Sequence, residues 1–334
     1  MASTRISGSY LLKRIAVSLV TLWAILTLLF VLFHAMPGDY VSTMAGNPEL
    51  SPEQRQAIAE RFGLHQPLHI QYYEFITSYA MFDFGYSMSR PEPVFDIIVH
   101  RLPRTLVLLG TATLLQFTIG VLAGIHFGWN RGSRTDKTGF ISGLTWYSIP
   151  FFWLAWILLL VFAYGAIGVQ WFPSAHMTPR YVSSFDSINL MMNVLHHMAL
   201  PVLSLTAVGW AGTMLVMRTT MQETLNEEYI LTARAKGLAP TVVKYKHTAR
   251  NALIPVTTQS IVVIAFIIDG SIIIETVFNW PGMGLLLIEA IQTQNLTVAL
   301  ASFYLLGVAI VVARLLQDII YTFLDPRIKF GEGQ

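Results

Sequence analysis

Long runs of apolar residues, separated by shorter polar segments, dominate this chain. Six of them are long enough to cross about 30 Å of membrane hydrocarbon as a helix. They cover Ile15–Met36, Thr105–Trp129, Gly139–Tyr164, His197–Met217, Pro255–Val277 and Val298–Phe323. The pattern predicts an all-α membrane protein with six transmembrane helices.

The composition supports the same class. Hydrophobic residues make up 54% of the chain and charged residues 12%, and the mean hydropathy is +0.56. The charged share is about half that of an average soluble domain, so the apolar excess would overfill a soluble core. Cysteine is absent, which excludes disulfides, cysteine nucleophiles and thiolate metal sites. The formal net charge of +2 is too small to indicate nucleic-acid binding.

The first apolar run follows Lys13 and Arg14, as the apolar part of a signal peptide would. It is longer than the roughly 7–15 residues of such a region, and no A-x-A-like cleavage site comes after it. We therefore expect a retained first helix at 15–36, preceded by an N-terminal tail at 1–14.

Charge asymmetry between the polar segments predicts the orientation. The N-terminal tail, the segment after the second run and the segment 218–254 are rich in basic residues; the last holds six basic residues against three acids. The segment 37–104 is the reverse, with eight acids and five basic residues. We expect both termini in the cytoplasm of a multi-pass protein of the plasma (inner) membrane, and 37–104 outside.

The outer segment 37–104 is too long to be a simple connection. Ser51, Pro52 and Gln54 match the start of a helix, with Ser51 as N-cap and Pro52 in the first turn. Two interpretations stay open for this segment. It is either a passive cap or a surface that receives something from outside.

The inner segment 218–254 carries the clearest local signal. Residues 226–236 are expected to form a helix, with Asn226 as N-cap and acidic residues near its start. Gly237 then ends it, and a second helix follows Pro240 as far as Leu253. Pro255 is expected to begin the next span.

Ala233 and Ala235, with Gly237, leave the end of this predicted helix with little side-chain bulk. An ordinary positively charged inner loop explains the Lys and Arg residues, but not two helices separated by Gly237 and Pro240. The pattern favours a surface that docks into a partner protein.

Several strings along the chain together resemble a known family. They are Glu228-Tyr-Ile-Leu-Thr-Ala-Arg-Ala-Lys-Gly-Leu238, Arg250-Asn-Ala-Leu-Ile-Pro255, Met36-Pro-Gly-Asp39, Phe62-Gly-Leu-His-Gln-Pro-Leu68, Phe84-Gly-Tyr-Ser87, Arg101-Leu-Pro-Arg-Thr105, Glu275-Thr-Val-Phe-Asn-Trp-Pro-Gly-Met-Gly284 and Asp325-Pro-Arg-Ile328. In this order among six spans, the chain resembles permease subunits of ATP-binding-cassette importers of the dipeptide/oligopeptide class.

The resemblance implies a type I importer permease core at 105–334, with 218–254 as a loop that couples it to a cytoplasmic ATPase. It implies that the permease pairs with a second, related permease, two ATPase subunits and an extracytoplasmic substrate-binding protein. Where the general importer pattern has Glu-Ala-Ala, this chain has Leu231-Thr232-Ala233. The residues expected to couple are Glu228, Thr232, Ala233, Arg234, Ala235, Lys236 and Gly237.

The chain has no G-x-x-x-x-G-K-[ST] phosphate-binding loop. We therefore expect no catalytic residue, metal site or cofactor in this chain. ATP and Mg²⁺ would be bound by the partner ATPases.

Ionisable residues inside a span are costly and mark pathway residues. Asp269, Ser271 and Glu275 are therefore candidates for the substrate pathway. Asp269 and Glu275 point about 120° apart on a helix, so they share a face only if the helix breaks at Gly270–Ser271. A structural pairing of Asp269, and a turn at Glu275 beside Trp280, are the alternatives.

Three functional classes are open to a membrane protein with this pattern. An importer permease explains the docking loop, and peptides are its commonest substrates; oligosaccharides, glutathione or nickel chelates are alternatives within that class. An intramembrane hydrolase would need a base placed to activate Ser260 or Ser271, and no histidine within a span does so. A self-sufficient channel or carrier would leave the docking loop unexplained.

Overall fold

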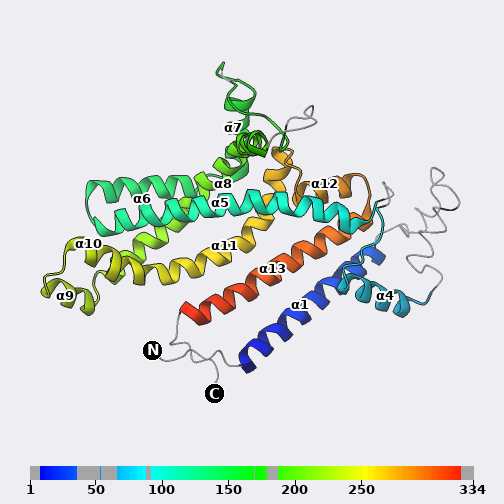
Figure 1. Ribbon diagram of the computed structural model, residues 1–334, viewed down its shortest axis with the longest axis horizontal. Helices are drawn as coiled ribbons and strands as arrows, with labels where there is room; N and C mark the ends of the chain where they lie inside the picture. The colour runs from blue at the N-terminus through cyan, green and yellow to red at the C-terminus, as the bar shows by residue number, and fades with distance from the viewer. Residues whose placement is uncertain are drawn as a thin grey trace. The chain divides into compact units, whose positions relative to one another are not determined.

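The computed structural model describes residues 8–35, 53, 66–87, 92–168, 170–178 and 187–324, and for 8–11, 187, 258–271, 317 and 319–324 the backbone only. Every regular element in these ranges is helical (Figure 1). The elements are α1 (Gly8–Ala35), α4 (Leu68–Ala80), α5 (Val94–Trp129), α6 (Arg134–Tyr147), α7 (Phe151–Leu158), η1 (Leu159–Ala163), α8 (Ser187–Thr224), α9 (Glu228–Ala235), α10 (Pro240–Val242), η2 (Val243–Ala249), α11 (Arg250–Val277), α12 (Met283–Gln292) and α13 (Leu296–Leu324). The helix start predicted at Ser51, Pro52 and Gln54 lies outside the described residues.

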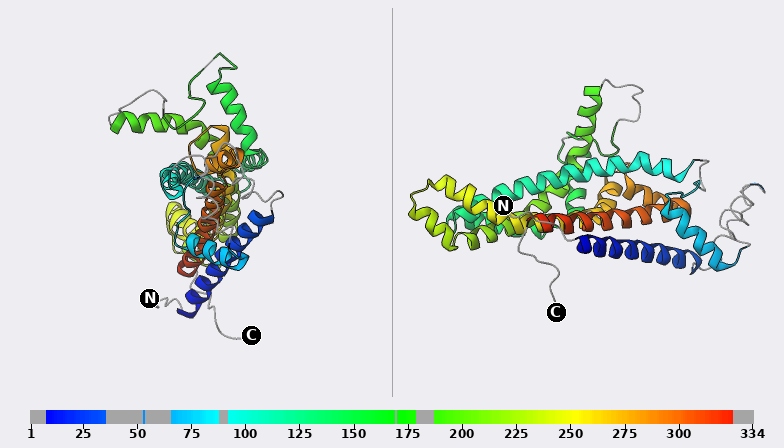
Figure 2. Two further views of the ribbon diagram at one scale, coloured as in Figure 1. Left: turned by 90° about the vertical axis from the view of Figure 1, so that its right-hand side faces the viewer. Right: turned by 60° about the horizontal axis from the view of Figure 1, so that its bottom comes forward.

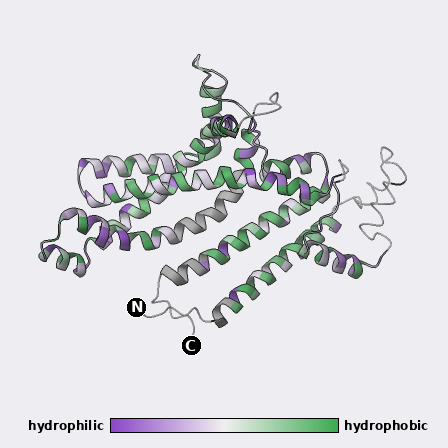
Figure 3. Cartoon of the chain, viewed as in Figure 1, coloured by the Kyte–Doolittle hydropathy of each residue, from purple (hydrophilic) through white to green (hydrophobic). Residues whose placement is uncertain are grey.

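Four described helices are long and apolar enough to cross a membrane, and a bent pair adds a fifth candidate. The four stretches are Leu12–Ala35, Val94–Trp129, Ile188–Thr224 and Leu296–Leu316. Figure 3 shows apolar residues along these helices. The remaining predicted run, Pro255–Val277, lies in α11, where the side chains of 258–271 are not described. The sixth span therefore stays a prediction.

The predicted run Gly139–Tyr164 is two helices, α6 and α7, bent by 88°. The break falls at Ser148–Pro150. Proline disfavours helical backbone in the residue before it, so Ile149 leaves the helix and Pro150 starts a new one. Figure 2 shows α7 and the first part of α8 projecting away from α5, α6 and α11.

The chain divides into two compact units. The larger one is built on His100–Ile288, and the smaller one combines Ile6–Val99 with Glu289–Leu315. Each has its own buried core.

In the larger unit, α5 and α8 approach closely along a row of glycines spaced four residues apart. The facing residues are Gly120, Gly124 and Gly128 of α5 and Thr213, Met217 and Met221 of α8. A β-carbon on Gly120 would lie 2.6 Å from that of Thr213, and one on Gly128 would lie 2.5 Å from that of Met221. Lipid gives helices no hydrophobic reason to associate, so small residues that allow close van der Waals packing hold such pairs together.

Two apolar clusters complete the core of the larger unit. One joins α5, α7, η1, α8 and α11 around Leu108, Leu159, Ile274 and the fully buried Trp280. The other joins α5, α8, η2 and α11. Its buried members are Val121, Ile125, Met217, Met221, Ala249, Ala252 and Val256. The helices α5 and α11 therefore contribute to both clusters.

The core of the smaller unit is largely aromatic. Rings contact one another from α1 through α4 to α13, with Phe30–Phe75 centroids 5.6 Å apart, Phe75–Tyr79 4.3 Å apart and Tyr79–Tyr304 5.6 Å apart. A hydrogen bond of 2.8 Å between the hydroxyls of Thr27 and Tyr72 adds a polar link between α1 and α4. These contacts fix α4 against α1.

Candidate functional site

The predicted coupling helix is α9, and it starts later than expected. Its N-cap is Glu227, not Asn226. Asn226 instead donates from its amide nitrogen to the Gln222 carbonyl oxygen at the end of α8, 3.1 Å away. Because α8 extends to Thr224, Asn226 belongs to the end of that helix rather than to the start of α9.

Gly237 ends α9 as predicted. Its φ is +73°, in the left-handed region that favours glycine. The Gly237 N–H donates to the Arg234 carbonyl at 2.9 Å, and the Leu238 N–H to the Ala233 carbonyl at 3.4 Å. This pair of hydrogen bonds is the Schellman motif, which satisfies carbonyls at a helix end.

One face of α9 is buried against the rest of the larger unit. Ile230 is 0% exposed and Ala233 5% exposed, and both pack on Val243 of η2. Leu225 and Trp129, the last residue of α5, cover the same cluster. The structure thus corrects the predicted orientation of Ala233, whose side chain anchors α9 and is not part of an exposed surface.

Two polar contacts reinforce this anchoring. The Arg234 guanidinium lies 6.0 Å from the centre of the Trp129 ring, a cation–π distance. The Asn251 amide donates to the Tyr229 hydroxyl at 3.1 Å. The orientation of α9 is therefore tied both to the end of α5 and to the start of α11.

The other predicted coupling residues lie on the exposed side. They are Glu228, Thr232, Arg234, Ala235, Lys236 and Gly237. The sequence reasoning missed four large apolar side chains on the same segment. Tyr229 is 42% exposed, Leu231 58%, Leu238 38% and Tyr245 54%. We call the exposed residues of this segment the α9 surface. They are Glu228, Tyr229, Leu231, Thr232, Arg234, Ala235, Lys236, Gly237, Leu238 and Tyr245.

The second predicted helix continues into the next span without a break. The helix α10 starts at Pro240, as predicted, passes into the π-helical η2 and then into α11, which includes Pro255. The Thr248 hydroxyl donates to the Val243 carbonyl, five residues back, at 3.0 Å. Pro255 lies inside α11 and does not begin a helix, and the point where the membrane span begins stays a prediction.

A partly buried ion pair joins α6 to α8. Arg218 donates from Nε and Nη2 to the two carboxylate oxygens of Asp136, at 2.5 and 3.1 Å. Asp136 also accepts the Gly132 N–H at 2.9 Å, and its side chain is 3% exposed. The bidentate geometry fixes the angle between the two helices at this end.

The three predicted pathway residues all lie on α11. The helix runs through Gly270 and Ser271 without interruption, so no break brings Asp269 and Glu275 onto one face. The side chains of Asp269 and Ser271 are not described, and their pathway role stays a prediction. Glu275 is 0% exposed and accepts hydrogen bonds from Thr105, Gly284 and Leu285. No surface of it is accessible to a substrate in this structure.

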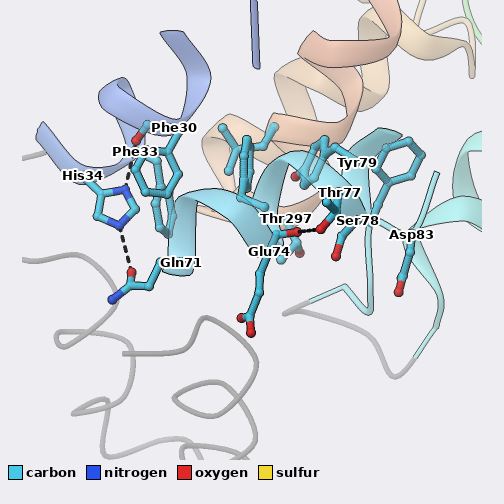
Figure 4. A pocket seen from close by; sticks show the side chains of 13 residues that line it. Phe30, Phe33, His34, Gln71, Glu74, Thr77, Ser78, Tyr79, Asp83 and Thr297 are labelled. Carbon is cyan, nitrogen blue, oxygen red and sulfur yellow. Dashed lines mark hydrogen bonds between the residues drawn. The ribbon is translucent and has the colours of Figure 1, made fainter. Parts of the chain in front are cut away.

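The smaller unit contains a pocket of about 310 Å³ between α1, α4 and the start of α13. The rings of Phe30, Phe33 and Phe75 are among the residues that line it. His34 Nε2 lies 3.1 Å from the Gln71 amide oxygen (Figure 4). The described residues contain no group of three or more side chains placed to hold a metal ion. The pocket combines aromatic rings with polar side chains, among them the carboxylates of Glu74 and Asp83.

Comparison with known proteins finds a family match for the N-terminal part of the chain and another for the rest. Residues 116–330 match the family model "Binding-protein-dependent transport system inner membrane component". Residues 8–109 match the model of the N-terminal part of the membrane component of the same systems. Together the two matches cover most of the chain.

Curated relatives match over nearly their full lengths. The oligopeptide transport system permease protein AppB of Bacillus subtilis (strain 168) is 33% identical over 97% of this chain and 100% of its own length. The di/tripeptide transport system permease protein DppB of Pseudomonas aeruginosa (strain UCBPP-PA14) is 31% identical over 96% and 98%. The glutathione transport system permease protein GsiC of Salmonella typhi is 32% identical over 96% and 99%.

The matches also account for the multiple apolar helices, since the family consists of multi-pass inner-membrane components. They agree with a transport subunit rather than an enzyme. The chain belongs to the binding-protein-dependent transport system inner membrane components, as a permease of the dipeptide/oligopeptide family of ATP-binding-cassette importers.

Proposed function

We propose that this permease forms half of a translocation pathway for peptides and docks a cytoplasmic ATPase through the α9 surface. Its partners are a second homologous permease, two ATP-binding-cassette ATPase subunits and an extracytoplasmic substrate-binding protein that meets the segment 37–104. ATP and Mg²⁺ are bound by the ATPases. Both termini lie in the cytoplasm, on the side of the α9 surface.

The observation that carries the docking proposal is the two-sidedness of α9. Its inner face is fixed by Ile230 and Ala233, which are buried. Its outer face presents Tyr229 and Leu231, next to the cations Arg234 and Lys236. Exposed apolar groups with a polar margin are typical of protein interaction sites, and a fixed helix loses little conformational freedom on binding.

Co-purification tests the docking surface. In cells that also express the second permease and both ATPases, Leu231→Glu should abolish recovery of the ATPases with the permease. Gly237→Glu would be ambiguous, because the φ of +73° at this position favours glycine and a side chain would strain the end of α9. Ala233→Glu is a poor test, because a carboxylate there would enter the buried cluster. Tyr73→Glu is the control, since Tyr73 is 69% exposed but lies in the smaller unit. Full ATPase recovery with Leu231→Glu would refute docking through this surface.

The peptide assignment rests on the relatives, whose names refer to oligopeptides, di/tripeptides and glutathione. In proteoliposomes with the cognate binding protein, dipeptides or oligopeptides should accumulate and stimulate ATP hydrolysis. Glutathione is itself a peptide and is tested as a second substrate in the same assay. Stimulation by an oligosaccharide or a nickel chelate alone would overturn the substrate class.

Asp269 and Ser271 remain our proposed pathway residues. Burial of a carboxylate within a span is costly unless it has a functional or pairing role. Uptake by Asp269→Asn should fall for cationic peptides more than for neutral ones. Unchanged uptake across both classes would leave Asp269 with a structural role.

A further inference from the structure

The end of α11 farthest from α9 is fastened by a buried carboxylate. Glu275 Oε1 accepts the Thr105 hydroxyl at 2.7 Å, and Oε2 accepts the backbone N–H groups of Gly284 at 2.7 Å and Leu285 at 3.1 Å. The Met283 N–H in turn donates to the Thr105 hydroxyl oxygen at 2.7 Å. The carboxylate lies at the N-terminal end of α12, where it accepts from two backbone N–H groups that have no partner within that helix.

Two of the strings singled out in the sequence meet at this point. Thr105 ends Arg101-Leu-Pro-Arg-Thr105, and Glu275 begins the string that runs to Gly284. A second cross-link lies beside the first: the buried Trp280 donates from its indole N–H to the Arg104 carbonyl at 3.1 Å. We call these contacts of Thr105, Arg104, Glu275, Trp280 and the start of α12 the α5–α11 junction.

The junction leaves no room for a larger residue at Gly282. A β-carbon there would collide with both Glu275 Oε1 and Thr105 Oγ1. The segment before α12 therefore packs directly against the Glu275 carboxylate and the Thr105 hydroxyl.

The opposite ends of the same two helices are also joined. Val121 and Ile125 of α5 pack with Ala252 and Val256 of α11 in the second apolar cluster. The stretch from Thr105 to Ile125 and the stretch from Val256 to Glu275 are both about 30 Å long at 1.5 Å per residue. The two helices thus run antiparallel with matched spacing between their attachment points.

The helix α11 also continues directly from the segment that carries the α9 surface, through α10 and η2. We propose that Glu275 and Thr105 are positioning residues that lock α5 to α11, so that a force applied at the α9 surface moves both helices as one body. This role rests on the proposed docking function. As positioning residues, Glu275 and Thr105 transmit movement between the helices and contact neither ATP nor peptide.

The test uses the complete transporter in proteoliposomes and compares Thr105→Val with Thr105→Ser. Valine has the shape of threonine without the hydroxyl, whereas serine keeps the hydroxyl. Thr105→Val should retain both ATPases and basal ATP hydrolysis while peptide uptake per ATP falls about tenfold, the change that corresponds to ~1.4 kcal/mol. Thr105→Ser should stay within about twofold of the original protein, since it restores the hydrogen bonds.

Glu275→Gln gives an independent arm. The amide NH₂ of the new glutamine cannot accept a hydrogen bond. At least one of the donors to Glu275, the Thr105 hydroxyl or the N–H groups of Gly284 and Leu285, would therefore lose its acceptor. We expect the same loss of uptake per ATP as for Thr105→Val. Gly110→Ala is the control for α5, because a β-carbon there meets no atom within 4 Å.

The outcomes separate the two proposals. Normal uptake per ATP in both Thr105→Val and Glu275→Gln would overturn the transmission role. Loss of assembly in both, with Thr105→Ser intact, would overturn it too, because the junction would then serve folding alone. If the ATPases did not co-purify with the unmodified permease, the docking proposal itself would fail.

Discussion

Asp136 shows how one side chain can organise the end of a membrane helix. Its carboxylate accepts from Arg218 and from the Gly132 N–H, while Ser133 caps the start of α6 by accepting the Asp136 N–H at 3.1 Å. Arg218 also lies 4.8 Å from the centre of the Phe140 ring. The sequence placed Asp136 among basic residues in a short polar loop, and only the structure shows that Arg218, 82 positions away, is its partner.

Asp136→Asn should destabilise the permease by about 1–3 kcal/mol, because the partly buried Arg218 loses its carboxylate partner. Thermal unfolding in detergent measures this as a lower midpoint. Asp96→Asn is the matched control, since Asp96 is exposed in the first turn of α5. Equal midpoints for the two variants would contradict a stabilising role for the Asp136–Arg218 pair.

At the scale of elements, the close approach of α5 and α8 depends on the absence of side chains. The glycine row of α5 lies against the backbone and β-carbons of α8, with the Gly124 position 2.9 Å from the Met214 carbonyl oxygen if a β-carbon is added. Glycine costs helix stability in isolation. Its presence at three positions spaced four residues apart is explained by the close helix packing that it permits.

Gly124→Ala should therefore destabilise the larger unit by about 1–3 kcal/mol, because its β-carbon would overlap that of Met217. Gly110→Ala on the same helix should be neutral or stabilising by up to about 1 kcal/mol, since alanine is the better helix former. Thermal unfolding of both variants in the same detergent is the measurement. A destabilisation of Gly110→Ala as large as that of Gly124→Ala would show that glycine at these positions serves something other than packing.

For the whole molecule, the orientation in the membrane is the prediction that most affects function. The absence of cysteine makes it directly testable. In cells that express the permease without the ATPases, Thr232→Cys, on the α9 surface, should react with a membrane-impermeant maleimide only in inside-out vesicles. Tyr73→Cys, exposed on α4, should react only in right-side-out cells. Labelling in the reverse pattern would contradict the charge-based orientation.

Much of the fold followed from the sequence because membrane helices carry strong local signals. An apolar run must satisfy its own backbone in lipid, so its length and composition predict a helix without knowledge of its neighbours. The same locality made Gly237 predictable as a helix end, since the left-handed conformation favours glycine. The bend at Pro150 was missed, although its cause is local, because the run 139–164 was interpreted as one span from its length and overall apolar content.

The candidate site was predictable only in part. The sequence alone indicated a short helix that ends at Gly237 and the order of the helices along the chain, whereas its role in binding a partner stays a prediction. The direction of each side chain depended on tertiary packing: Ala233 turns inward because Ile230, Val243 and Trp129 form a cluster beneath α9. Only the tertiary structure joined Thr105 to Glu275 and Asp136 to Arg218, because hydrogen bonds between residues 170 and 82 positions apart leave no periodic trace in the chain.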